Sequence, residues 1–236
     1  MIHLPRLDPF EPNGFPDPGE ALREPNGLLA FGGDLSPERL LAAYSRGIFP
    51  WFSEDEPILW WSPDPRCVFR TDGMHISRRL RRQLAQSPWT LTVDRAFTEV
   101  MRACAAPRAY QQGTWITEDM IQAYGALHAL GHAHSVEVWD GDELVGGIYG
   151  LAVGRLFCGE SMFSRRSGGS KVALVGLCRL LRQWDFPLLD AQVTNPHLMS
   201  MGAVEMARED FLRTIRGLAA LPGPEGMWRV TDGSVF

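Results

Sequence analysis

Lysine is almost absent from this chain of 236 residues, and long hydrophobic runs are absent altogether. Lys171 is the single lysine among 23 basic residues, and the others are arginines. No apolar stretch approaches the roughly 20 residues that a membrane-spanning helix needs. The segment from Met1 to Arg6 also lacks the apolar core of a signal peptide. These absences exclude a helical membrane protein, and we expect a cytoplasmic one.

Cysteine is also scarce, and its placement argues against a disulfide framework. The four cysteines lie far apart in apolar surroundings, which predicts reduced core residues without a disulfide or metal role. The formal net charge of −5 argues weakly against a nucleic-acid partner, although net charge does not describe local charge. The cysteines are Cys67, Cys104, Cys158 and Cys178.

The sequence changes near residue 66 from a Pro- and Gly-rich region with one predicted helix to a region with several predicted helices. Residues 1–35 are rich in proline and glycine and predict an irregular segment, after which Ser36-Pro37-Glu38 begins a helix that Gly47 ends. Four further helices are predicted from apolar residues that recur on one face. Two begin with a cap residue: Asp94, with Phe97, Val100, Met101 and Cys104 facing inward, and Ser170, with Leu174, Leu177, Cys178 and Leu181 facing inward. The others run from Thr117 to Gly131, with Met120, Tyr124 and Leu127 facing inward, and over 209–221.

Four stretches have the pattern of strands. Residues 135–139 alternate as in a half-buried strand, and Asp140-Gly141 is typical of a hairpin turn. The return strand is predicted over 144–151, with further strands over 155–158 and 187–193. The pattern predicts an α+β fold whose mostly antiparallel sheet carries helices on its faces. We divide it into a small N-terminal domain (1–65) and a main domain (66–236).

Glu160 lies in the first stretch that could carry chemistry. The sequence Gly159-Glu160-Ser161-Met162-Phe163 resembles a nucleophile elbow but lacks its final glycine, and no Asp and His follow in the expected order. A serine hydrolase is therefore disfavoured. Glu160 is either a solvent-facing acid at a strand end or a partly desolvated carboxylate that awaits a cation.

Asp190 and Gln192 form the second candidate. Residues two apart on a strand share a face, so both side chains are expected to point the same way. Their neighbours Leu188, Leu189 and Val193 predict burial, and a buried carboxylate needs a hydrogen-bonding partner. The pair is either structural or part of a site.

Two basic segments could bind an anion. Arg165 to Lys171 is a glycine-containing loop before a helix, where free backbone N–H groups favour a phosphate; the alternative is a flexible basic loop. It lacks the Walker A spacing and is similar to the pyrophosphate loop of acetyl-CoA-dependent N-acetyltransferases. Arg78-Arg79-Leu80-Arg81-Arg82 is either a solvated helix face or a contact to a nucleic-acid backbone.

Histidine and tryptophan give two weaker candidates. His128, His132 and His134 suggest a metal cluster, but Gly131 is predicted to end the helix between them, so we favour no metal. Trp115 lies in a turn just before a helix and could serve as a platform on which a base stacks.

Seven stretches together resemble the bacterial leucyl/phenylalanyl-tRNA–protein transferases. The resemblance implies a small N-terminal domain and an acetyltransferase-like (GNAT-like) main domain. It also implies transfer of Leu or Phe, with Met as an open third donor, from aminoacyl-tRNA to proteins with N-terminal Arg or Lys. The product is marked for degradation under the N-end rule, and no metal or nucleotide cofactor is implied. We expect a monomer. The stretches are 27–51, 60–66, 113–117, 144–154, 157–164, 170–171 and 188–195.

The resemblance also implies roles for individual residues. Asp190 and Gln192 match the catalytic pair: Gln192 orients the attacking amine, while Asp190 holds Gln192 and supplies negative potential. Glu160 is assigned to the cationic acceptor. The donor side-chain pocket is expected from Ile148, Phe157, Gly159, Met162, Leu174, Leu177 and Leu181. The tRNA 3′ end is expected at Trp115, Tyr44, Trp51 and Asn195, with Asn195 as oxyanion donor, and the tRNA backbone at Arg78, Arg79, Arg81, Arg82, Arg165 and Lys171.

Several alternatives stay open at this point. Leu177 and Leu181 occupy positions that are often aromatic in the family, which leaves the choice between Leu and Phe undecided. The chief rival is an acyl-CoA-dependent N-acyltransferase. Others are an enzyme that transfers amino acids from tRNA to a peptidoglycan precursor or lipid, and a tRNA- or peptide-binding module without catalysis.

Overall fold

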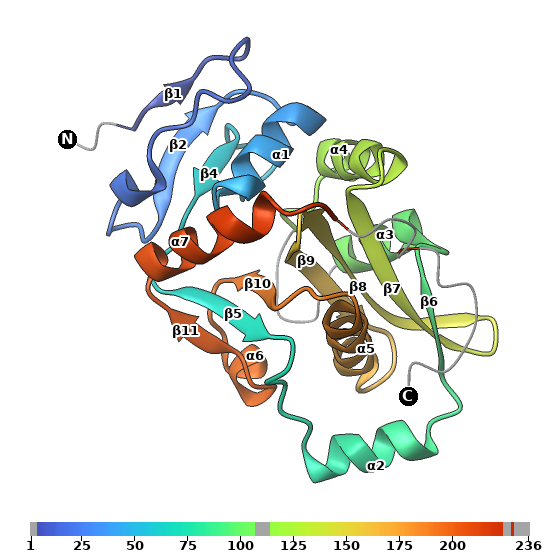
Figure 1. Ribbon diagram of the computed structural model, residues 1–236. Coiled ribbons are helices and arrows are strands. Elements are labelled where there is room, and N and C mark those ends of the chain that lie inside the picture. The colour runs from blue at the N-terminus through green and yellow to red at the C-terminus, as the bar shows by residue number, and fades with distance from the viewer. Residues whose placement is uncertain (1–3, 107–113, 224–227, 229–236) are drawn as a thin grey trace.

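Two β-sheets organise the chain in the computed structural model, which describes residues 4–106, 114–223 and 228 (Figure 1). The smaller sheet has the order β1-β2-β4-β3 and lies beside helix α1 (Pro37–Ser45). A short 3-10 helix, η1 (Pro18–Glu20), precedes β2. The strands are β1 (Arg6–Leu7), β2 (Leu28–Gly32), β3 (Phe49–Pro50) and β4 (Leu59–Trp61).

The larger sheet has the order β11-β5-β10-β9-β8-β7-β6. Every neighbouring pair is antiparallel except β9 and β10, which are parallel. The prediction of a mostly antiparallel sheet is therefore confirmed. Its strands are β5 (Arg66–Arg70), β6 (Thr90–Val93), β7 (Ala133–Asp140), β8 (Glu143–Val153), β9 (Leu156–Ser164), β10 (Leu188–Gln192) and β11 (Val204–Met206).

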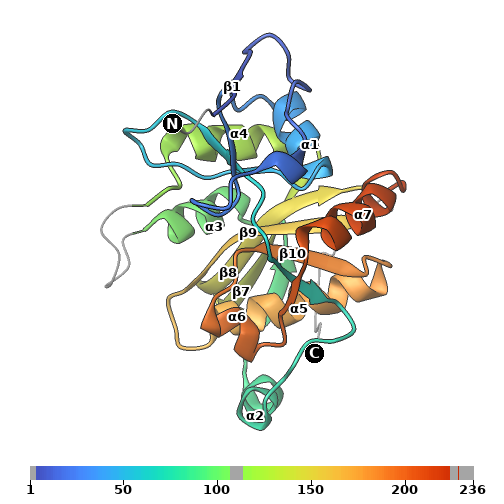
Figure 2. The same cartoon turned by 90° about the vertical axis from the view of Figure 1, so that its left-hand side faces the viewer.

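Helices cover both faces of the larger sheet. Figure 2 shows α3 and α4 on one side and α5 on the other, and the two buried hydrophobic clusters divide in the same way. The cluster on the α3 side continues into α1 and the smaller sheet, so the N-terminal unit packs directly on the main one. The helices are α2 (Arg78–Gln86), α3 (Phe97–Ala105), α4 (Glu118–Ala129), α5 (Gly169–Gln183), α6 (Pro196–Ser200) and α7 (Arg208–Ala219).

Most of the expected helices and strands are confirmed, and all four cysteines are buried and form no disulfide, as expected. Ser36 and Thr117 cap α1 and α4, each accepting from a backbone N–H three residues later. The strand at 135–139 is confirmed as part of β7, but its expected half-burial is wrong, because β7 is an interior strand and all its residues except Asp140 are buried. No helix in the part of the chain described here is long and apolar enough to span a membrane.

Two of the expected helix caps are also wrong. Asp94 does not cap α3; its carboxylate accepts from Ser135 N and contacts His134 instead. Ser170 lies inside α5, whose N-cap is Gly168 at φ +92°. The Ser170 N–H donates to Ser164 Oγ at 2.8 Å, so this serine ties the helix to β9.

Gly146 lets the first turn of α5 approach β8. A Cβ at Gly146 would lie 2.6 Å from the Cα of Gly169, which is backbone and cannot move aside. We therefore expect Gly146→Ala to lower the free energy of unfolding by about 1–3 kcal/mol, as overpacking does. In α4, Gly125→Ala meets nothing within 4 Å and should raise stability by about 0.5–1 kcal/mol. Urea denaturation of both variants checks the pair, and equal effects would contradict the close approach.

Candidate active site

The parallel strands β9 and β10 separate just where the site residues lie. Their last paired residues are Cys158 and Asp190. Beyond this point β10 is irregular and Gln192 has a φ of +61°, so it pairs with Cys67 of β5. Asp190 and Gln192 nevertheless lie on the same side of the sheet, as expected. Their partners Arg66 and Glu160 adjoin the hydrophobic cluster of α1 and α4. Leu189 and Ala191 pack on the α5 side. Gln192 points into the gap between the strands, and Asp190 lies next to it.

Arg66 and Asp190 form a buried ion pair at the base of this gap. Arg66 Nε donates to Asp190 Oδ1 at 2.8 Å and Nη2 donates to Oδ2 at 2.7 Å, with both side chains only 1% exposed. Arg66 Nη1 donates to the carbonyl of Gly47. Asp190 Oδ1 also accepts from the backbone N of Gln192 at 2.9 Å. The pair therefore fixes the backbone of Gln192 in its left-handed conformation.

Glu160 of β9 is the carboxylate that faces this gap. Gln192 Nε2 and the Tyr44 hydroxyl donate to its Oε1 at 2.8 and 2.7 Å, and Tyr124 donates to Oε2 at 3.2 Å. Burial raises the pKa of Glu160 to about 7; the three donors lower it and the negative charge of Asp190 raises it further. Glu160 therefore titrates close to neutral pH.

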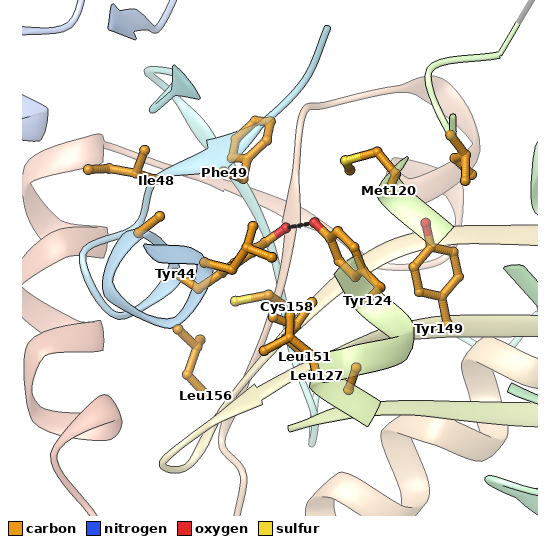
Figure 3. Packing of buried hydrophobic residues seen from close by; sticks show 14 of the residues in the cluster. Tyr44, Ile48, Phe49, Met120, Tyr124, Leu127, Tyr149, Leu151, Leu156 and Cys158 are labelled. Atoms are coloured by element: carbon orange, nitrogen blue, oxygen red, sulfur yellow. Dashed lines mark hydrogen bonds between the residues drawn. The ribbon is translucent and has the colours of Figure 1, made fainter. Parts of the chain in front are cut away.

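Tyr44 and Tyr124 bring two distant segments to the Glu160 carboxylate. Figure 3 shows their hydroxyls pointing at each other from α1 and α4, in contact with one another. Burial and the nearby Glu160 raise the pKa of both phenols well above their ordinary value. They stay protonated and donate. The structure thus places Tyr44 behind Glu160, away from the walls of the cavity where the tRNA 3′ end was expected.

A cavity of about 350 Å³ opens beside Glu160 and Gln192. Its size lies within the range of small-molecule sites. One part of its wall is apolar and aromatic, and the other is polar. The apolar part includes Phe49, Trp51, Phe69, Trp115, Ile148, Met162, Leu174, Leu189 and Leu198, and the polar part includes Glu160, Gln192, Thr194 and Asn195.

The expected donor-pocket residues fall into two groups. Ile148, Gly159, Met162 and Leu174 line the cavity. Phe157, Leu177 and Leu181 do not line it and are buried in the cluster between α5 and the sheet. The reason is position along each element: Leu177 and Leu181 lie one and two turns beyond Leu174, and Phe157 precedes the opening between β9 and β10.

Three residues expected at the tRNA 3′ end do line the cavity. Trp51 is 45% exposed and packs at an angle against Trp61. Trp115 lies on the wall just before α4. Asn195 Oδ1 caps α6 by accepting from Leu198 N at 2.9 Å, so its carbonyl end is held.

The two basic segments lie side by side. The four arginines of α2 are exposed, and Gln83 Nε2 on the same helix donates to the carbonyl of Ser167 at 3.2 Å. Lys171 lies on the first turn of α5. Arg165 points elsewhere: its guanidinium donates to Leu144 O and lies 3.6 Å from Glu99.

Sequence reasoning gave no role to Arg66 or Tyr124 in the site. Arg66 was visible as a charge that opens an apolar strand, Arg66-Cys67-Val68-Phe69, which is a signal for a buried partner. Tyr124 was expected to point inward, but nothing in the sequence connects it to Glu160. The three histidines weighed as a metal cluster do not all lie together: His128 and His134 are grouped with Asp94, and His132 is not part of the group.

The chain matches two family models in consecutive segments. Residues 68–216 match the family described as leucyl/phenylalanyl-tRNA protein transferase, and residues 33–64 match the N-terminal domain of the same family. The chain belongs to this family. A leucyl/phenylalanyl-tRNA–protein transferase of Xanthomonas axonopodis pv. citri is 60% identical over 230 residues, which covers 96% of this chain and 92% of the relative.

Solved structures of other proteins are more distant from this transferase family member. L-PGS from Bacillus licheniformis aligns with a TM-score of 0.39 and 14% identity, over 72% of this chain and 57% of that one. A GCN5-related N-acetyltransferase-like protein from Streptococcus suis aligns with a TM-score of 0.31 and 12% identity, over 69% and 61% of the two chains.

We expect Asp190→Asn in this transferase to be strongly destabilising, because the Arg66 cation would stay buried without its charge partner. Loss of one member of a buried pair costs about 3–5 kcal/mol. The double variant Arg66→Met/Asp190→Leu should recover part of this loss, since no buried charge is left. Urea unfolding of Arg66→Met, Asp190→Leu and the double variant measures the coupling in a double-mutant cycle. Additive effects would show that the two side chains do not depend on each other.

Glu160 should make stability fall as the pH rises from about 4.5 to 7. Its pKa is raised in the folded state, so the folded protein binds the proton more tightly than the unfolded chain in this window. The lost stability amounts to about 3 kcal/mol. The slope of unfolding free energy against pH should be smaller in Glu160→Gln, and equal slopes in both proteins would contradict the buried titration.

Proposed function

We propose that this chain transfers Leu or Phe from aminoacyl-tRNA to the α-amino group of proteins with N-terminal Arg or Lys. The observation that carries the proposal is the cavity itself. It places an apolar pocket next to a Glu160–Gln192 hydrogen bond, so that a hydrophobic side chain and a reacting amine can lie side by side. Family membership supports the same chemistry.

The apolar wall would take the donor side chain. Ile148, Met162 and Leu174 offer a dry surface for Leu or Phe, and the difference between the two is worth only about 1–3 kcal/mol in such a pocket. Trp115 and Trp51 would hold the terminal adenosine by stacking, at about 1–3 kcal/mol for each stacked base.

Gln192 would orient the attacking amine. Its Nε2 donates to Glu160, so its side-chain carbonyl oxygen is the end left to accept an N–H from the amine. Asp190 acts one step further back, by holding the backbone N of Gln192. Its negative potential also reaches the site, where it raises the pKa of Glu160, and its two hydrogen bonds with Arg66 fix its position.

Glu160 has a pKa close to that of the α-ammonium group, which must lose a proton before it can attack. An α-ammonium group has a pKa of about 7.7–8.0, and that of Glu160 is about 7. Transfer between them is therefore nearly free, and the neutral amine can attack the ester carbonyl. The bond from this carbon to the ribose oxygen then breaks, and this oxygen leaves as a hydroxyl by taking the proton that the nitrogen loses as the amide forms. Asn195 would donate to the oxyanion, a contact worth roughly 3 kcal/mol.

The wider setting of the reaction also belongs to the proposal. We place the site in a main domain of acetyltransferase-like fold (66–236) beside the small N-terminal domain (1–65), supported by the antiparallel sheet with one parallel pair. The proposal also includes that the protein is a monomer in the cytoplasm, that the transfer uses no cofactor, and that the product is marked for degradation.

The test is transfer of radiolabelled Leu from Leu-tRNA to a peptide that begins with Arg. A matched peptide beginning with Glu is the control, and RNase treatment of the donor should abolish labelling. Gln192→Ala should lower the rate of transfer while leaving the fold intact. Absence of label on both peptides would overturn the proposal and favour acyl-CoA donors, and label on the Glu peptide would overturn the acceptor specificity.

The arginines of α2 should hold the tRNA backbone through phosphates, without reading sequence. We expect Arg78→Gln/Arg82→Gln to weaken tRNA binding and to lower the slope of log affinity against log salt by about 2. A matched control removes two exposed arginines of α7, Arg213→Gln/Arg216→Gln. Filter binding at several salt concentrations compares them, and equal slopes in both double variants would contradict the assignment.

A further inference from the structure

Asp94, His128 and His134 form a cluster outside the cavity. Asp94 follows β6, His128 lies in the last turn of α4, and His134 lies on β7. Each offers one atom that can bind a metal, and these atoms lie within 4.8 Å of one another. None of the three residues lines the cavity beside Glu160.

His134 faces an oxygen atom at each of its ring nitrogens. Nδ1 lies 2.7 Å from Asp94 Oδ2, and Nε2 lies 3.1 Å from the carbonyl oxygen of Gly131. A proton on Nε2 satisfies the Gly131 carbonyl and fixes the ring. This outer hydrogen bond to a backbone carbonyl is the one that metal-binding histidines usually make. Nδ1 then faces the Asp94 carboxylate, and either a proton or a metal cation at this nitrogen satisfies the contact.

Asp94 and His128 are held ready beside that nitrogen. Asp94 has a φ of +57°, a left-handed conformation that is uncommon outside glycine. Its Oδ1 accepts from Ser135 N at 2.8 Å and lies 3.9 Å from His128 Nδ1. The His128 ring stacks flat on Phe97, with 4.3 Å between ring centroids. The carboxylate and both imidazoles are thus positioned by contacts of their own.

We propose that these three side chains bind a Zn²⁺ ion. Two imidazoles and one carboxylate are a common set of zinc ligands, at about 2.0–2.2 Å from the metal. The side chains of Asp94 and His128 are 17% and 30% exposed, so an ion can enter and a water can complete the tetrahedron. Binding requires His128 Nδ1 to lose its proton and its 2.8 Å hydrogen bond to Ala133 O. It also requires His134 Nδ1 and Asp94 Oδ2, now 2.7 Å apart, to separate to the more than about 3 Å that two ligands of a tetrahedral zinc need.

A metal here would join three elements around the site. It would tie the end of α4 to β7 and to the turn before α3. Tyr124, which donates to Glu160, lies one turn before His128 on the same face of α4. The ion therefore acts as a structural clamp on the helix that supports the Glu160 carboxylate, and it takes no part in the transfer itself.

The experiment is zinc titration of the full chain after treatment with a chelator, followed by calorimetry and by metal analysis after dialysis. We expect one Zn²⁺ per chain and a rise in Tm when zinc is added. His128→Gln and Asp94→Asn should each weaken binding by at least tenfold. His132→Gln is the matched control, because this histidine lies next to the cluster but outside it, and it should bind as the parent does.

A second measurement uses the tryptophan that covers the cluster. Trp228 stacks on the His134 ring with centroids 3.9 Å apart, so Co²⁺ at the site should quench its fluorescence and show visible ligand-field absorption. Quenching should be lost in Trp228→Phe and weakened in His128→Gln. No retained zinc, or retention unchanged in both His128→Gln and Asp94→Asn, would overturn the proposal.

Discussion

The ion pair between Arg66 and Asp190 is the contact on which the arrangement of the site depends. It crosses from β5 to β10. The same guanidinium reaches the N-terminal unit through Gly47 O and lies against the rings of Phe49 and Phe211. Desolvation makes a buried ion pair a poor source of stability. Its value here is positional, since one group fixes two strands, α7 and the N-terminal unit relative to each other.

The N-terminal unit is part of the active site as well as of the core. The hydroxyl of Tyr44 in α1 donates to Glu160 of β9, 116 residues later in the chain, and is also hydrogen-bonded to the Tyr124 hydroxyl of α4. Residues of α1 and of the smaller sheet lie in the same hydrophobic cluster as α3 and α4. Movement of this unit would therefore change the environment of the Glu160 carboxylate.

Local sequence signals predicted where helices begin and end better than they predicted contacts between distant segments. Ser36, Thr117 and Gly131 act within a few residues of chain, and their effects on α1 and α4 follow from the sequence alone. Asp94 has the composition of a cap, but its partner Ser135 lies 41 residues away on a strand. The competing contact exists only in the folded chain, which is why the cap prediction failed.

The same distinction applies to the site residues. Glu160, Asp190 and Gln192 were candidates from their own residue patterns, and the resemblance to a family gave them their roles. Arg66 lies 124 residues from Asp190 in the sequence, and no periodicity connects the two. Leu177 and Leu181 share a helix face with Leu174, so the sequence could not show that the cavity ends before them.

Burial of Glu160 links the fold to the chemistry that we propose. A carboxylate in water titrates near 4.3 and could not accept a proton from an ammonium group without a cost of several kcal/mol. Burial of Glu160 where β9 and β10 separate, with Tyr44 and Tyr124 behind it, brings its pKa to about 7. Three donors at the carboxylate limit the rise. The separation of two parallel strands thus provides both the room for a hydrophobic donor and a proton acceptor matched to the attacking amine.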